Sequence, residues 1–150
     1  MKATLDDEGF YNKESILNLI LNTEGVSYEY VLAVLNSRLA NWFYKRRFTN
    51  SSKLTVNLSK EYVSQIPIKI PPKADQRKVG HLVERILTAK RRDAEADVSA
   101  LEREIDQLVY GLYGLTPEEI QIVEDTGEKI QTPLHPTGIT HGAHPTPRGA

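Results

Sequence analysis

A proline-bearing segment, Ile66–Pro72, divides the chain into two parts with different sequence patterns. It reads IPIKIPP, and proline both fixes its own φ and biases the preceding residue toward extended geometry. We therefore expect an extended stretch that a regular helix cannot cross. Residues 1–72 mix strand-like and helix-like patterns, whereas the residues that follow show helical spacing alone.

Two short apolar stretches before this segment predict strands. Residues 16–21 (ILNLIL) form a nearly continuous apolar run that is followed by a turn at Thr23-Glu24-Gly25. Residues 54–58 alternate between apolar and polar side chains, which is typical of a half-buried strand. Ser59 is placed to cap a single helical turn over residues 60–64. These patterns together predict a small mixed sheet.

A flanking helix is predicted between the two expected strands. Ser27 is a favourable helix N-cap, and large apolar residues then recur at three- and four-residue spacing. This spacing predicts one amphipathic helix over residues 28–46. Its apolar residues are Tyr28, Val31, Leu32, Leu35, Leu39, Trp42 and Phe43.

The helical part, residues 73–125, has three segments with apolar periodicity. The first covers residues 75–92, and the second carries a helix-pairing stripe of Leu101, Ile105, Leu108 and Leu112. A break near residues 93–98 is favoured because Ser99–Glu102 matches a capping box, but one continuous helix remains the alternative. Thr116 and Pro117 start a third helix that runs to about Glu124.

Residues 126–150 are rich in proline and glycine and poor in large apolar side chains. Such a segment buries too little surface to offset its chain entropy, so we predict a disordered tail. The expected fold is α+β. It consists of a small mixed sheet with its flanking helix, a C-terminal helical part and the tail.

Charge is distributed very unevenly along the sequence. Residues 38–92 hold fourteen lysines and arginines against three acids, although the whole chain has a net charge of −1. A basic middle between two acidic ends indicates a polyanionic partner such as a nucleic acid. A solvated basic helix face is the alternative interpretation.

The densest basic stretch supplies the candidate DNA-binding residues. They are Arg38, Lys45, Arg46, Arg47, Asn50, Ser51, Ser52 and Lys53, the last four of which form an expected polar turn. The neighbouring aromatic residues Trp42, Phe43 and Phe48 are interpreted as core residues rather than as platforms for stacked bases. A second group of basic residues lies later in the sequence and is expected either to contact the DNA backbone or to face the acidic C-terminal helix. Its members are Arg77, Lys78, Arg85 and Arg91.

No catalytic or metal site is predicted. The chain has no cysteine, no glycine-rich phosphate loop and no nucleophile elbow. His135, His141 and His144 lack a nearby acid that would complete a metal shell. No apolar run is long enough to span a bilayer, and the N-terminus lacks the apolar core of a signal peptide. We therefore expect a cytoplasmic protein with no membrane partner.

Three segments resemble one family of proteins. Tyr30–Leu39 (YVLAVLNSRL) resembles a helix of TaqI-like specificity domains, and Leu58–Ile70 is similar to the segment of those domains that ends in LPIP. Leu101–Ile120 (LEREIDQLVYGLYGLTPEEI) resembles the ending of many type IIG restriction–modification enzymes and adenine-specific DNA methyltransferases, including the phage-defence BREX type. Residues 73–77 (KADQR) also resemble a helix start of type I specificity subunits.

The resemblance implies that residues 1–72 are the C-terminal half of a DNA target recognition domain, that residues 73–125 are closing helices and that the partner is double-stranded DNA. In such enzymes a separate methyltransferase domain binds S-adenosylmethionine and methylates adenine. This chain lacks the Asn-Pro-Pro-Tyr/Phe motif of that domain, so the resemblance implies no cofactor here and a methyltransferase domain in cis or in trans. The chain would then be a fragment, a truncated reading frame or a specificity piece that acts in trans, as in type I systems. A helix-pairing interaction module is the alternative function.

Overall fold

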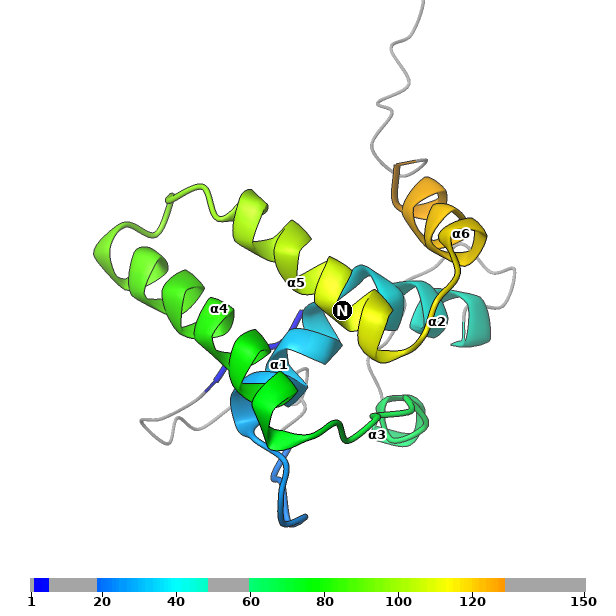
Figure 1. Ribbon diagram of the computed structural model, residues 1–150, viewed down its shortest axis with the longest axis horizontal. Helices are drawn as coiled ribbons and strands as arrows, with labels where there is room; N and C mark the ends of the chain where they lie inside the picture. The colour runs from blue at the N-terminus through cyan, green and yellow to red at the C-terminus, as the bar shows by residue number, and fades with distance from the viewer. Residues whose placement is uncertain (1, 6–18, 49–59, 129–150) are drawn as a thin grey trace, which may run out of the picture.

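All regular secondary structure in residues 2–5, 19–48 and 60–128, the part that this computed structural model describes, is helical (Figure 1). The helices are α1 (Tyr28–Asn36), α2 (Arg38–Phe48), α3 (Lys60–Val63), α4 (Lys73–Arg92), α5 (Ser99–Leu112) and α6 (Pro117–Glu128). Their apolar sides pack together, and the hydrophobic core contains buried residues from α1 to α5.

The prediction of an α+β fold with a mixed sheet is wrong, because the described residues contain no strand. Residues 19–21 of the first expected strand are irregular, and both Leu19 and Ile20 are exposed. A short apolar run does not by itself distinguish a strand from an irregular segment. Residues 16–18 and the second expected strand at 54–58 lie outside the described residues.

The expected helix over residues 28–46 is two helices. Ser27 caps α1 as predicted, because its Oγ accepts a hydrogen bond from Tyr30 N–H at 3.2 Å. Ser37 interrupts the helix with an extended ψ of 154°, and its Oγ then accepts the N–H of Ala40. The hydroxyl also donates to Val34 O at 2.6 Å. Serine side chains often form local hydrogen bonds with the backbone that compete with those of a helix. Ser37 is therefore the residue in the sequence that could have indicated this break.

The proline-bearing segment has no regular secondary structure from Pro67 to Pro72, and no strand among the described residues pairs with its backbone. Two tyrosine hydroxyls, one from α1 and one from the residue after α5, bind it instead. Tyr30 of α1 donates to Lys69 O at 2.6 Å. Tyr113, just after α5, donates to Pro67 O at 2.8 Å and accepts Lys69 N–H at 3.0 Å. These side chains satisfy backbone groups that a neighbouring strand would otherwise pair.

The predicted break between the two long helices is confirmed. Helix α4 ends at Arg92 and α5 begins at Ser99, although Ser99 is a helical residue and not the cap. Its backbone N–H donates to Asp97 Oδ1 at 2.9 Å. The predicted helix start at Thr116 and Pro117 is also confirmed, and it contains a capping box: Thr116 N–H donates to Glu119 Oε2, and Glu119 N–H donates to Thr116 Oγ1.

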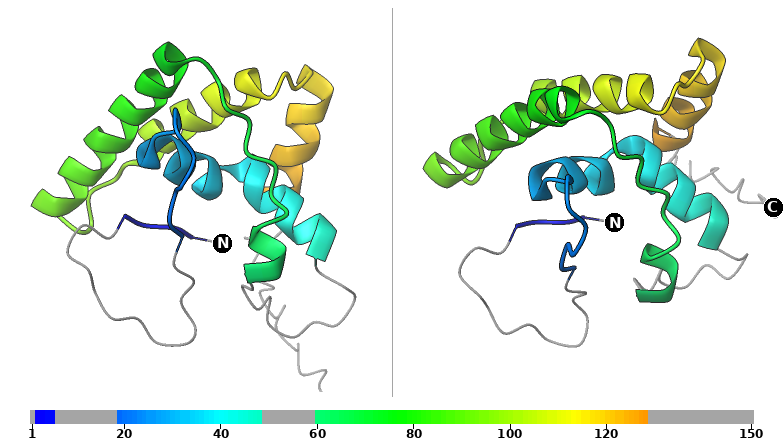
Figure 2. Two further views of the ribbon diagram at one scale, coloured as in Figure 1. Left: turned by 90° about the horizontal axis from the view of Figure 1, so that it is seen from below. Right: turned by 60° about the horizontal axis from the view of Figure 1, so that its bottom comes forward.

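Helices α4 and α5 run in roughly opposite directions and form one layer, and α1 and α2 form the layer beneath it (Figures 1 and 2). Helix α1 lies at the centre and packs mainly against α4, and α6 packs against α2. The largest fully buried side chains are Tyr30, Tyr44 and Tyr110, together with Val79 and Val109. The basic end of α2 and the C-terminal end of α4 consequently lie at opposite ends of the molecule (Figure 1).

The helices extend slightly beyond the boundary that we predicted for the C-terminal part. Residues 126–128 belong to α6, whereas residues 129–150 of the expected tail lie outside the described part of the chain. None of the helices that the structure describes is long and apolar enough to cross a membrane.

Candidate nucleic-acid interface

The last turn of α2 presents a basic surface. Lys45, Arg46 and Arg47 follow one another there, and both arginines are exposed. Arg46 lies over the ring of Trp42, with its Cζ 5.3 Å from the ring centroid, and Arg47 lies 6.0 Å from the centroid of Phe48. Such contacts use the flat face of a guanidinium and leave its N–H edge available to phosphate oxygens.

An aromatic cluster packs α3 against the end of α2 that carries this basic surface. Phe48 stacks on Tyr62 of α3 with 4.6 Å between ring centroids, and Tyr44 packs against both rings. Phe43 and Phe48 also pack against the hydrophobic core. Phe43 and Phe48 therefore help to hold the end of α2 in place, which agrees with their interpretation as core residues, whereas Trp42 is half-buried and is not part of the core cluster.

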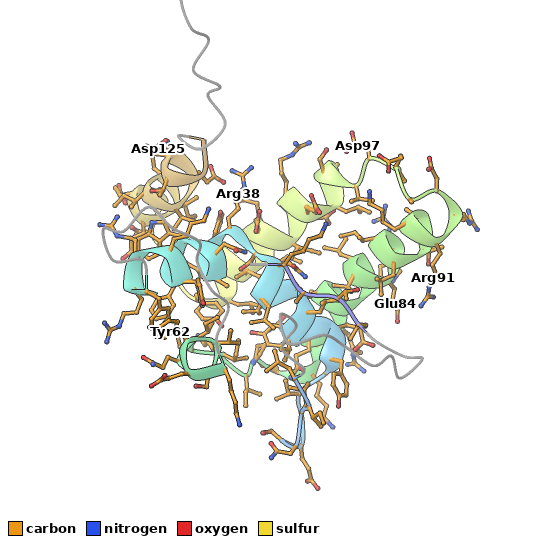
Figure 3. All side chains as sticks on the ribbon, turned by 180° about the vertical axis from the view of Figure 1, so that it is seen from behind. Arg38, Tyr62, Glu84, Arg91, Asp97 and Asp125 are labelled. Carbon is orange, nitrogen blue, oxygen red and sulfur yellow. The ribbon has the colours of Figure 1, made fainter. Side chains whose placement is uncertain are left out.

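Arg38 has a different environment from the other candidates, because it is bound by an acid of α5. Its backbone N–H donates to Asp106 Oδ1 at 2.9 Å, and its Nε lies 3.5 Å from Asp106 Oδ2. Figure 3 places Arg38 on the side of the molecule where α5 and α6 lie. Burial raises the pKa of the Asp106 carboxyl, an effect that the hydrogen bond and the charge of Arg38 oppose. Asp106 thus caps α2 and joins it to the C-terminal helices.

The four remaining candidates, Asn50, Ser51, Ser52 and Lys53, lie outside the described residues. Their assignment to a DNA-reading turn stays a prediction. The structure thus brings together the three consecutive basic residues at the end of α2, and it places Arg38 seven residues before Lys45, at the start of that helix.

The later basic residues lie on the solvent-exposed side of α4. Arg77, Lys78, Arg85 and Arg91 are all exposed, whereas Val79, Leu82 and Val83 form the buried side. Lys78 pairs with Asp75 within the helix at 3.1 Å. Figure 3 shows Arg91 and Glu84 projecting from the outer side of α4. Helix α4 meets α1 and α5 through apolar side chains, and its basic side points away from the core.

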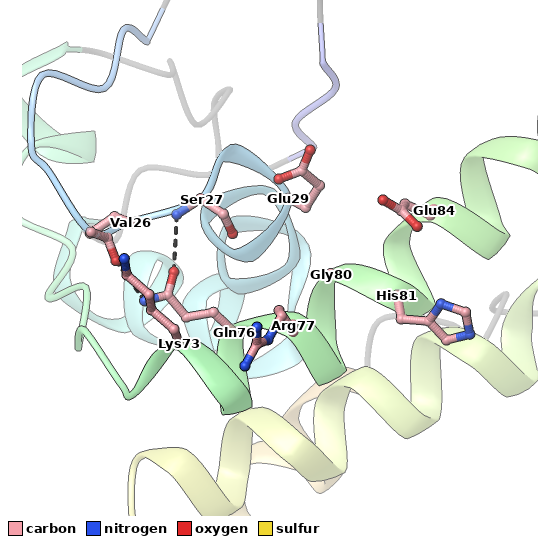
Figure 4. A pocket seen from close by; sticks show the side chains of 10 residues that line it. Val26, Ser27, Glu29, Lys73, Gln76, Arg77, Gly80, His81 and Glu84 are labelled. Carbon is pink, nitrogen blue, oxygen red and sulfur yellow. Dashed lines mark hydrogen bonds between the residues drawn. The ribbon is translucent and has the colours of Figure 1, made fainter.

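Gln76 is a structurally important residue that sequence reasoning missed. Its side chain is buried and accepts Ser27 N–H at 3.0 Å, and its Nε2 donates to Gly25 O and Pro71 O. One side chain thereby joins the start of α1 to the start of α4 (Figure 4). A glutamine within a helix whose other polar residues are exposed gives no local signal of such a role.

A hollow of about 660 Å³ lies beside Gln76, between the start of α1 and the first half of α4. Lys73, Arg77 and His81 line it, but Glu29 and Glu84 do so as well (Figure 4). This mixed charge does not define a catalytic constellation. No group of three or more histidines and acids suited to a metal ion occurs in the part of the chain that the structure describes.

Comparison with known families identifies the N-terminal part of the chain. Residues 1–68 match the family model of the TaqI-like C-terminal specificity domain. The match ends within the proline-bearing segment, so it includes α1, α2 and α3 and excludes α4 to α6. Comparisons with curated proteins and with solved structures find no significant match.

The family match and the basic end of α2 point to the same function. TaqI-like specificity domains are DNA-sequence specificity domains of restriction–modification enzymes, and they bind DNA in association with a methyltransferase. Residues 1–68 are thus similar to the TaqI-like C-terminal specificity domains.

Proposed function

We propose that this chain is the DNA target recognition part of an adenine-specific DNA methyltransferase or type IIG restriction–modification enzyme. Its role is to position the enzyme on duplex DNA through phosphate contacts and to contribute side chains that read base edges. S-adenosylmethionine would be bound by a methyltransferase domain, in cis or in trans, and methyl transfer would take place there. The cytoplasm is the compartment where such an enzyme meets its DNA.

The observation that carries this proposal is the family match over residues 1–68, within which the exposed Arg46 and Arg47 lie. Guanidinium groups held against aromatic rings lose less side-chain freedom when they bind phosphate. The basic end of α2 is therefore a suitable anchor for the DNA backbone. It is followed directly by the polar residues 50–53, for which we propose contacts with DNA.

The methyltransferase context is supported by the C-terminal helices. The segment that resembles the ending of type IIG enzymes, Leu101–Ile120, forms α5, the turn after it and the start of α6. Asp106 in this segment caps α2 of the specificity domain. The segment thus packs directly on the part of the chain that matches the TaqI-like family, as expected for closing helices of a target recognition domain.

The alternative of a helix-pairing module is less well supported. That function requires the stripe of Leu101, Ile105, Leu108 and Leu112 to be available to a partner. Ile105 is buried in the core, and the three leucines are partly buried against it. The chain's own α2 and α4 pack against the helix that carries this stripe.

The proposal predicts that reversing the charge of Arg46 and Arg47 weakens DNA binding without unfolding the protein. In the variant Arg46→Glu/Arg47→Glu, two favourable phosphate contacts become repulsive, so we expect a loss of about a hundredfold in affinity at low salt. The free energy of unfolding should change by less than about 1 kcal/mol, because both side chains are exposed. Fluorescence anisotropy with a labelled duplex and urea unfolding measure the two quantities.

The matched control is Lys69→Glu/Arg103→Glu, which removes the same charge from two exposed positions on the proline-bearing segment and α5. It should retain most of the affinity for DNA. Equal losses in the two variants would show that only net charge matters and would contradict a binding site at the end of α2.

A further inference from the structure

The outer side of α4 carries a strong excess of positive charge. This charge is separate from the basic residues 45–47 at the end of α2. The exposed basic residues on the outer side of α4 are Lys73, Arg77, Lys78, Arg85, Arg91 and Arg92, and Glu84 is the acid among them. The same side also carries Ala74, His81 and Thr88. Four of these cations, Lys73, Arg77, Arg85 and Arg92, form no ion pair with any described residue.

This arrangement differs from an ordinary solvated helix. Exposed helices usually place opposite charges three or four residues apart, because such pairs stabilise the helix and like charges destabilise it. In α4, Lys73 and Arg77 are like charges at that spacing. Lys73 is also the first residue of the helix, where the helix dipole disfavours a cation. Stability of the helix alone does not account for these residues.

Lys73 and Arg77 on the basic side of α4 line the hollow beside α1 together with Glu29, but they form no ion pair with any described residue. The acidic helix α5 contacts α4, but the contact is made by the apolar sides of the two helices. The sequence left open whether Arg77, Lys78 and Arg85 face that acidic helix. They are exposed instead, and the pairing of Lys78 with Asp75 lies within α4 itself.

The dimensions of α4 match a stretch of duplex DNA. A helix of 20 residues is about 30 Å long, which corresponds to roughly nine base pairs of duplex at about 3.4 Å each. Lys73 and Arg92 stand at the two ends of α4, with Arg77 and Arg85 between them. The cations are thus spread over a length that spans many phosphates. The C-terminal end of α4 lies at the opposite end of the molecule from Arg46 and Arg47 (Figure 1).

We propose that the outer side of α4 is a second DNA-binding surface, which contacts the phosphate backbone of the duplex beside the target sequence. This inference rests on the proposed function and adds a separate surface, outside the TaqI-like domain, to the one at the end of α2. The contacts are electrostatic and independent of base sequence. They extend the length of duplex that the chain engages and increase its affinity for any DNA of sufficient length.

The first test removes two of the unpaired cations. In the variant Arg77→Gln/Arg85→Gln, the affinity for a duplex of about 30 base pairs should fall tenfold or more at low salt, and the slope of log affinity against log salt should become shallower by about two. Lys69→Gln/Arg103→Gln is the matched control and should leave both quantities nearly unchanged. Circular dichroism checks that both variants fold.

A second test detects proximity directly and does not depend on net charge. The chain has no cysteine, so a single Thr88→Cys substitution places one photo-crosslinking group in the middle of the exposed side of α4. Illumination should crosslink this position to the duplex. The same group at an exposed position of α5, Gln107→Cys, should give little crosslinking.

The outcomes separate this inference from the proposed function. If Arg46→Glu/Arg47→Glu loses affinity while Arg77→Gln/Arg85→Gln binds as the unmodified chain does, α4 does not bind DNA and the target recognition function stands. That result would indicate that the basic side of α4 binds an acidic protein surface instead of DNA. If neither variant loses affinity, both proposals fail. Equal losses in the α4 variant and in its control would also overturn a defined surface on α4.

Discussion

Single polar side chains connect parts of this protein that are far apart in the sequence. Gln76 forms three hydrogen bonds that join the start of α1, the proline-bearing segment and α4. Asp106 binds the first residue of α2 from α5, across 68 positions of sequence. Buried polar groups cost free energy unless they are paired, so these residues also favour one arrangement of the helices over others.

We predict that Gln76→Ala destabilises the protein by about 2 to 3 kcal/mol. The substitution leaves Ser27 N–H, Gly25 O and Pro71 O without their partner, and unsatisfied groups in part-buried positions cost about 1 to 3 kcal/mol each when water cannot replace the lost bond. Urea unfolding measures the change. The control Gln107→Ala removes an exposed glutamine and should change stability by less than about 0.5 kcal/mol. Similar values for the two variants would show that Gln76 does not join the helices.

At the scale of elements, the turn after α5 shows how a motif in the sequence determines a local structure. Gly114 has a φ of +68°, and Leu115 N–H donates to Tyr110 O while Gly114 N–H donates to Gly111 O. This is the Schellman arrangement, in which a residue in the left-handed region ends a helix and its last carbonyl groups are satisfied. The turn places Thr116 and Pro117 at the start of α6.

Two glycines three residues apart should respond oppositely to alanine. Gly114→Ala should destabilise the protein by about 1 kcal/mol, because alanine is strained at positive φ although open space surrounds the position. Gly111→Ala should stabilise it by about 0.5 to 1 kcal/mol, because Gly111 lies inside α5 with open space around it. Thermal unfolding distinguishes the two effects. A gain in stability from Gly114→Ala would contradict the role of this turn.

At the scale of the whole molecule, the sequence predicted those features that depend on neighbouring residues. The caps at Ser27 and Thr116 and the break between α4 and α5 are local, and the structure confirms them. The sheet was predicted wrongly, because a run such as residues 16–21 is compatible with several structures until its neighbours are known. Tyr30 and Tyr113, which bind the proline-bearing segment, are brought to it only by the packing of α1 and α5.

The assignment of DNA-binding residues stays a prediction. The clustering of basic residues made the end of α2 a candidate, since charge is visible in the sequence itself. The pairing of Arg38 with Asp106 could not be predicted, because no pattern in the sequence links positions so far apart. The exposure of the basic side of α4 could not be predicted either, because it depends on which side of that helix packs against the core.

The most direct test of DNA binding is a titration of the unmodified chain with duplex DNA at several salt concentrations. If about five phosphates are contacted, log affinity should fall against log salt with a slope near −4 to −5, since each neutralised phosphate contributes about −0.9. Binding should show little sequence preference, because we propose that the chain carries only the C-terminal half of a target recognition domain, and its phosphate contacts carry no base information. A complete absence of binding at low salt, or an affinity that does not change with salt, would contradict the proposal that this chain positions an enzyme on DNA.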